Sequence, residues 1–181
     1  NHLIFTGGKG RENMGMTACH MEAEQNLIER LKTKSEEDLF EAIEELEEEG
    51  AHRVYYLDKM WDGLHYILTG VSATTPIRDH LLSEAVVGTA MFSEDESADF
   101  ISYIYPKRVR EISSALEVFD IDNALSGFSP GELAQNDIYP AIWHESEKES
   151  LREELAAAFH ELKAFFSAMA SDSKGIVISI Y

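Results

Sequence analysis

The stretch from residue 53 to residue 70 constrains the fold more than any other part of the chain, because strand, turn and helix signals follow one another there. Residues 54–57 read Val-Tyr-Tyr-Leu, a composition typical of a pleated strand. Asp58 follows directly and is predicted to be the N-cap of a helix over residues 59–69. Gly70 can adopt the left-handed conformation that ends such a helix. The stretch therefore predicts a strand that turns straight into a short helix.

The helix predicted over residues 59–69 has one apolar face. At about 100° per residue, this face carries Met60, Trp61, Leu64, Ile67 and Leu68. An isolated helix of this length is marginal in water, so packing against the rest of the protein must hold it. Trp61 is the largest of these side chains and is expected to be the main packing contact.

Helix and strand patterns alternate along the rest of the chain. Strands are predicted over residues 16–21, 100–105 and 176–180, and the last is apolar enough to lie centrally in a sheet. Helices are predicted over residues 22–31, after Ser35 with Asp38 as a capping box, after Pro106, over residues 120–125, and after Ser146 with Glu149 as a second capping box.

The longest helical pattern lies near the C-terminal end. It places six apolar residues at regular helical spacing: Leu151, Leu155, Phe159, Leu162, Phe166 and Met169. Strands and helices are interleaved without the regular spacing of βαβ units. We therefore predict an α+β fold, a single domain in which a mixed or antiparallel sheet is packed by several helices, including this long C-terminal helix.

Residues 1–13 differ from the rest of the chain. They contain three glycines, lack an amphipathic period and precede a Met-Gly-Met run at residues 14–16. We interpret them as a leader or an added extension and assign the domain to residues 14–181. A phosphate-binding loop is the alternative for the Gly-Gly-Lys-Gly run, but the spacing of a Walker motif is missing.

Composition bounds the kind of protein. The chain has 181 residues, of which 44% are hydrophobic, and this is enough for one core. The single cysteine, Cys19, excludes an internal disulfide and fits a reduced, cytoplasmic setting. No apolar run approaches the roughly 18 residues of a membrane span. A net charge of −19 disfavours nucleic acid and anionic membranes as partners, because binding either one needs clustered Lys and Arg.

A dense acidic cluster closes the helix predicted after Ser35. It consists of Glu44, Glu45, Glu47, Glu48 and Glu49. Acidic side chains at a helix C-terminus oppose the helix macrodipole, so the cluster is locally unfavourable. It is either a solvated face that serves solubility or a docking surface for a basic protein partner.

The strongest candidates for chemistry are Asp58, Asp62 and His65, which fall on one edge of the predicted helix. A carboxylate beside an imidazole can act as a general base and its orienting group. The alternative is an N-cap, a surface acid and a histidine packed on Trp61. Cys19 can be a thiol nucleophile or a buried structural residue, and in a strand it points away from its neighbour His20. The spacings indicate no metal site, and no cofactor is expected.

Several motifs together resemble the YfbM-like family, a family of bacterial domains of unknown function. The likeness spans residues 14–181, and its most specific part is Trp-x-x-Leu-His-x-x-Leu-Thr-Gly at residues 61–70. Met-Gly-Met at residues 14–16, Leu-Ser-Glu-Ala-Val-Val-Gly at residues 82–88 and Ile-Tyr-Pro at residues 138–140 add to it. The resemblance implies a soluble, cytoplasmic, single-domain α+β protein, and it assigns no catalytic residue.

Two classes of function remain. The first is a non-catalytic protein-binding module, of inhibitor or immunity type, for a basic partner. The second is a small enzyme with a pocket beside Trp61 and His65. A cleft that joins His65 to Cys19, Tyr139 or His144 would favour the enzyme, whereas an acidic face without such a cleft would favour the binding module. The sequence carries no signal for the oligomeric state.

Overall fold

A computed structural model describes residues 3, 5 and 15–181. In this part of the chain, five strands form one sheet: β1 (Ala18–Ala23), β2 (Val54–Asp58), β3 (Ala90–Met91), β4 (Phe100–Ile104) and β5 (Gly175–Ile180). The order is β2-β1-β5-β4-β3, and every neighbouring pair is antiparallel. The predicted α+β fold is therefore confirmed, with an antiparallel sheet.

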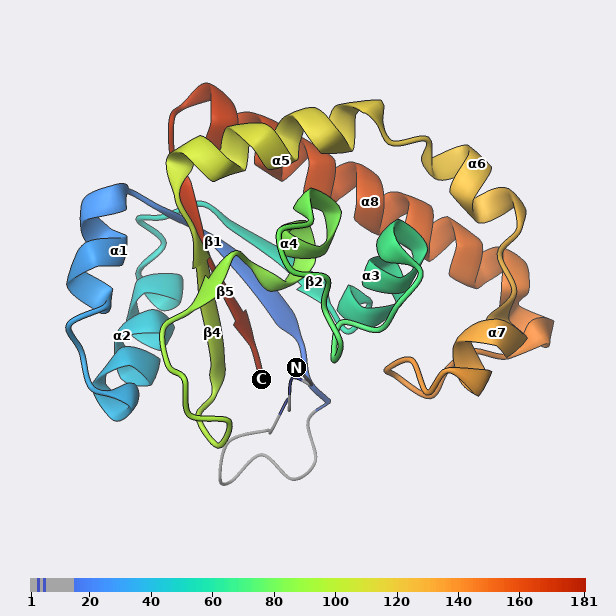
Figure 1. Cartoon of the computed structure of the whole chain (residues 1–181), viewed down its shortest axis with the longest axis horizontal. Helices are drawn as coiled ribbons and strands as arrows, with labels where there is room; N and C mark the ends of the chain where they lie inside the picture. Colours follow the sequence, from blue (N-terminus) through green and yellow to red (C-terminus); the bar gives the residue numbers. More distant parts are fainter. Residues whose placement is uncertain (1–2, 4, 6–14) are drawn as a thin grey trace.

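Helices lie on both faces of the sheet (Figure 1). One face is covered by α1 (Gln25–Leu31) and α2 (Glu36–Glu49), and the other by α3 (Trp61–Thr69), α4 (Leu81–Val87), α5 (Pro106–Val118) and α8 (Lys148–Ser171). The helices α6 (Ile121–Ser126) and α7 (Pro130–Gln135) lie at the end of the molecule farthest from α1 and α2, and a 3₁₀ turn, η1 (Glu145–Glu147), leads into α8.

The central strand β5 separates two apolar clusters. Ile176, Ile178 and Ile180 pack in the larger cluster, on the side of α3, α5 and α8, whereas Val177 packs with α1 and α2. This alternation follows from the two-residue period of a strand. All six residues of β5 are buried, as expected for the central strand that the sequence predicts.

The long C-terminal helix α8 packs along α5. All six residues that define its predicted apolar stripe are buried. No helix in the described part of the chain, α8 included, is long and apolar enough to cross a membrane. The predicted capping box at Ser146 is wrong, because the 3₁₀ turn over residues 145–147 runs directly into α8 and its N-cap, Glu147, makes no side-chain cap. The Ser35 cap is confirmed, since its hydroxyl accepts a hydrogen bond from the Asp38 N–H at 3.2 Å.

The turn into α3 differs from the prediction. Asp58 is the last residue of β2 and has a φ of 55°, so it is not an N-cap. This left-handed conformation reverses the chain, and α3 begins only at Trp61, after Met60, which makes no side-chain cap. Gly70, with a φ of 81°, ends α3 as predicted.

The predicted extension over residues 1–13 lies mostly outside the described residues, and its separate origin stays a prediction. Two described residues of this range contact the domain. Leu3 donates its N–H to the Thr74 carbonyl at 2.6 Å. The ring of Phe5 lies 4.8 Å from the rings of both Trp61 and Phe100.

Candidate functional site

Asp62 is a buried carboxylate that holds two segments against α3. Its side chain accepts hydrogen bonds from the Ala73 N–H at 2.7 Å, the Tyr139 N–H at 2.8 Å and the Ser72 hydroxyl at 2.9 Å. Only 1% of Asp62 is exposed. Both carboxylate oxygens of Asp62 therefore already accept hydrogen bonds, which a general base would have to give up to accept a proton. Without these donors, burial of the carboxylate would cost free energy of folding.

His65 is also buried and hydrogen-bonded at both ring nitrogens. Nδ1 donates to the Val71 carbonyl at 2.8 Å, so Nε2 of the neutral ring accepts from the Ser83 hydroxyl, also at 2.8 Å. Burial lowers the pKa of His65 and favours this neutral form. Ser83 accepts a further hydrogen bond from the Ile77 N–H at 3.1 Å and has no exposed surface. The hydroxyl–imidazole pair therefore joins the loop after α3 to α4, and neither residue has exposed surface.

Asp58 does not join these two residues. It is exposed at the end of β2, whereas Asp62 and His65 face the protein interior. The predicted polar edge of three residues is therefore wrong as a surface site, because α3 begins later than predicted and is buried on more than its apolar face.

Aromatic rings fill the space beside Trp61. Its ring stacks on Tyr139 with centroids 5.3 Å apart and also contacts Phe5, while its indole N–H donates to the Met16 carbonyl at 3.2 Å. The ring of Trp143, which belongs to the segment before η1, packs against α3 so closely that a Cβ at Gly63 would come within 2.5 Å of it. Trp61 is fully buried, as the sequence predicts.

Cys19 and His20 lie on opposite faces of β1, as expected for neighbours in a strand. Burial raises the pKa of the Cys19 thiol, so the thiolate that a nucleophile needs is disfavoured. The His20 Nε2–H donates to the Ala85 carbonyl at 2.9 Å on the other face. Both residues are buried.

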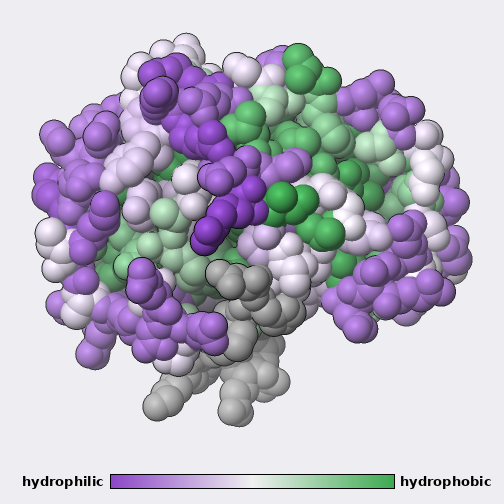
Figure 2. Space-filling view, viewed as in Figure 1, coloured by the Kyte–Doolittle hydropathy of each residue, from purple (hydrophilic) through white to green (hydrophobic). Residues whose placement is uncertain are grey.

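A groove with both acidic and apolar lining lies between α2 and residues 92–99. Its volume is about 820 Å³. Its carboxylates are Glu36, Glu37, Glu41, Glu44 and Asp99, and its apolar lining includes Leu39, Phe40, Phe92 and Ile101. The Ser93 hydroxyl donates to Glu36 across the groove. Figure 1 shows α2 beside the segment that joins β3 to β4, and Figure 2 shows hydrophilic surface over α1 and α2. We call this feature the acidic groove.

The side chains of the predicted acidic cluster have different surroundings on α2. Glu44 lines the acidic groove, whereas Glu45 and Glu49 line a separate depression with Arg30 and Lys34. Glu47 is half-buried and accepts a hydrogen bond from the Ser179 hydroxyl at 3.1 Å, and Glu48 is exposed. Of the predicted cluster, only Glu44 therefore lines the acidic groove.

Two carboxylates of the groove that the sequence did not single out, Glu37 and Glu41, lie earlier in α2 than the predicted cluster. With Glu44 they are spaced by four and three residues, which places all three on one helix face, and this spacing is a usable signal. Among the described residues, no group of three or more His, Cys, Asp or Glu side chains is placed to hold a metal ion.

Comparisons with known proteins agree with this fold. Residues 14–179 match a family model described as a domain of unknown function, DUF1877. The chain is 31% identical to Protein YfbM of Escherichia coli strain K12 over 136 residues, which cover 75% of this chain and 80% of that protein. The crystal structure of YfbM from Escherichia coli, a protein of unknown function, aligns with a TM-score of 0.73 and 23% identity over 91% of this chain and 99% of that one. The chain therefore belongs to the YfbM-like family of DUF1877 domains, as its motifs indicate.

Proposed function

We propose that this protein is a non-catalytic binding module that receives a basic polypeptide segment in the acidic groove. The observation that carries the proposal is the combination of an apolar lining with a rim of carboxylates in one groove. A merely solvated acidic face would not need the aromatic lining. Clustered charge of one sign speeds association with a partner of opposite charge, and the net charge of −19 acts in the same direction.

The chemistry of the groove matches long cationic side chains. Glu37 and Glu41 are exposed, and within the described residues neither forms an ion pair. Lys and Arg bury their methylene stems on apolar surface while their charged ends stay near water. The stems would lie on Phe40 and Phe92, and the charged ends would pair with the two carboxylates.

Catalysis is the weaker alternative for this molecule. Asp62, His65 and Cys19 are all buried, and the hydrogen bonds of the first two go to neighbouring segments of the same domain. An inhibitor or immunity-type protein, which acts by occupying its partner, needs no catalytic group. We further propose a cytoplasmic setting, where the single buried cysteine would stay reduced.

A peptide-binding measurement tests the proposal. A fluorescein-labelled peptide that alternates Lys, Arg and Leu is titrated with the full chain, and its anisotropy is followed at low and high salt. We expect the double variant Glu37→Gln/Glu41→Gln to bind about three- to tenfold more weakly than the parent at low salt, with a smaller difference at high salt.

The matched control is Glu153→Gln/Glu154→Gln, which removes the same charge from exposed positions on α8. This variant should bind like the parent. Equal affinities for the two double variants, or an affinity that does not depend on salt, would refute binding in the acidic groove.

A further inference from the structure

A second cavity lies against the other face of the same strands. It is bounded by the loop of residues 76–79, the end of α4 and the strands β3 and β4, with a volume of about 810 Å³. Phe100 lines this cavity, whereas the next residue, Ile101, lines the acidic groove. Successive residues of a strand point to opposite faces, so the two cavities are separate sites. We call the second one the Arg78 pocket.

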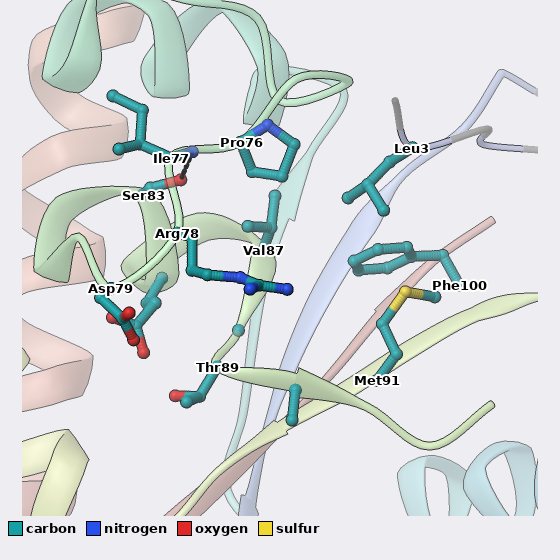
Figure 3. Close-up of a pocket in the computed structure, with 13 residues that line it drawn as sticks. Leu3, Pro76, Ile77, Arg78, Asp79, Ser83, Val87, Thr89, Met91 and Phe100 are labelled. Atoms are coloured by element: carbon teal, nitrogen blue, oxygen red, sulfur yellow. Dashed lines mark hydrogen bonds between the residues drawn. The ribbon is translucent and has the colours of Figure 1, made fainter. Parts of the chain in front are cut away.

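Arg78 is the cationic residue among the described residues that line this pocket. Its side chain extends from the loop toward the middle of the cavity, with Phe100 and Met91 on the opposite wall (Figure 3). Arg78 is exposed and has no hydrogen bond or ion pair to another residue of the described chain. Its guanidinium donors are therefore open to a ligand.

The other charges around the pocket are already paired or directed elsewhere. The Glu84 carboxylate accepts from Arg108, with a 3.0 Å bond from Nε and a second bond from the same guanidinium. Arg108 also pairs with Glu111 at 2.7 Å. The Asp79 side chain points away from the Arg78 guanidinium (Figure 3). The positive charge of Arg78 thus dominates the centre of the pocket.

Val87 and Gly88, which line the pocket after α4, pack closely against Ser102 of β4. The Ser102 hydroxyl donates to the Val87 carbonyl at 2.8 Å. Gly88, with a φ of 82°, lies so close that a Cβ there would be 2.3 Å from the Ser102 oxygen. The part of the wall formed by Val87 and Gly88 is therefore fixed against β4, which lowers the ordering cost of binding.

We propose that the Arg78 pocket binds a small organic anion with an apolar body. The guanidinium forms charge-assisted hydrogen bonds with a carboxylate, sulfonate or phosphate head, a geometry for which arginine is well suited. The apolar body lies on Met91, which is half-buried, and against the small exposed parts of Phe100 and Val87, which are 2% and 6% exposed. This site is independent of polypeptide binding in the acidic groove.

Fluorescence of 8-anilinonaphthalene-1-sulfonate, which joins an anionic head to aromatic rings, tests the proposal on the full chain. We expect saturable binding that weakens about tenfold in Arg78→Gln, since a hydrogen bond to a charged group is lost. Arg78→Lys should keep part of the affinity. Arg110→Gln, an equal change of charge at an exposed position on α5, should bind like the parent.

A neutral probe separates the guanidinium from the apolar wall. N-phenyl-1-naphthylamine has the same rings without the sulfonate, so Arg78→Gln should leave its affinity unchanged. The proposal is overturned if the anionic probe shows no saturable binding, if Arg78→Gln and Arg110→Gln have the same affinity for it, or if Arg78→Gln weakens both probes equally. Unchanged urea unfolding of Arg78→Gln verifies that the fold is intact.

Discussion

Single residues in this protein join segments that are distant in the chain. Asp62 connects α3 to the loop at Ala73 and to the backbone of Tyr139, 77 positions away. His65 and Ser83 connect α3 to α4 through one hydrogen bond. Buried polar groups need such partners, because an unsatisfied one costs free energy. The polar part of the motif over residues 61–70 thus has a structural basis.

Trp61 should be the largest single contributor to stability in this region. It is fully buried and contacts the rings of Phe5 and Tyr139. We expect Trp61→Ala to lower the free energy of unfolding by about 3–5 kcal/mol, the range for a large aromatic that leaves a core. Urea unfolding measures the change. Tyr56→Ala is the control, because Tyr56 is 57% exposed and its loss should cost less than about 1 kcal/mol. A comparable small loss for Trp61→Ala would contradict the packing described above.

His20 should make stability depend on pH. Burial lowers its pKa from 6.5 to about 4, so between these values the unfolded chain binds a proton that the folded protein excludes. Stability therefore falls as pH decreases from 6.5 towards 4, and the loss attributable to His20 is about 3 kcal/mol. Urea unfolding at several pH values measures it. His20→Gln should show a shallower decline over this range, and an unchanged decline would rule out His20 as the source.

At the scale of elements, the sequence predicted those features of helices that depend only on residues nearby in the chain. The apolar stripe of α8, the Ser35 cap and the glycine stop at Gly70 depend on neighbours within a few residues, and all three are confirmed. The turn at Asp58 could not be predicted, because a left-handed φ at a non-glycine residue depends on how β2 and α3 pack. Pro130 occupies the first turn of α7, where a missing N–H costs little.

Removal of an acidic charge from α2 should change the free energy of unfolding in opposite directions at the two ends of the helix. No basic residue lies in its last turn, and its first turn is acidic. Because the helix dipole favours anions only at the N-terminus, Glu48→Gln and Glu49→Gln should each raise the free energy of unfolding by about 0.3–1 kcal/mol. Glu37→Gln, in the first turn, should lower it. Urea unfolding at low salt measures these changes, and high salt should reduce them. The same sign at both ends would exclude the dipole as the cause.

At the scale of the whole molecule, the sheet creates two separate cavities on its two faces. The acidic groove needs α2 beside residues 92–99, and the Arg78 pocket needs the loop after α3 beside β4. These neighbours are distant in sequence, and the two-residue strand β3 leaves no periodic signal. The sequence therefore predicted the fold class, and of its acidic cluster over residues 44–49 only Glu44 lines the acidic groove. Which carboxylates share one groove depends on strand pairing that local patterns do not encode.

The most direct test of the central claim is to map where a basic peptide binds. The full chain, labelled with ¹⁵N, is titrated with the Lys-Arg-Leu peptide while amide chemical shifts are recorded. Binding in the acidic groove predicts that the largest changes fall on residues 36–44 and 92–99, and that Glu37→Gln/Glu41→Gln reduces them. Changes confined to residues 45–49 or to the helices on the other face of the sheet, or no changes at all, would contradict this account.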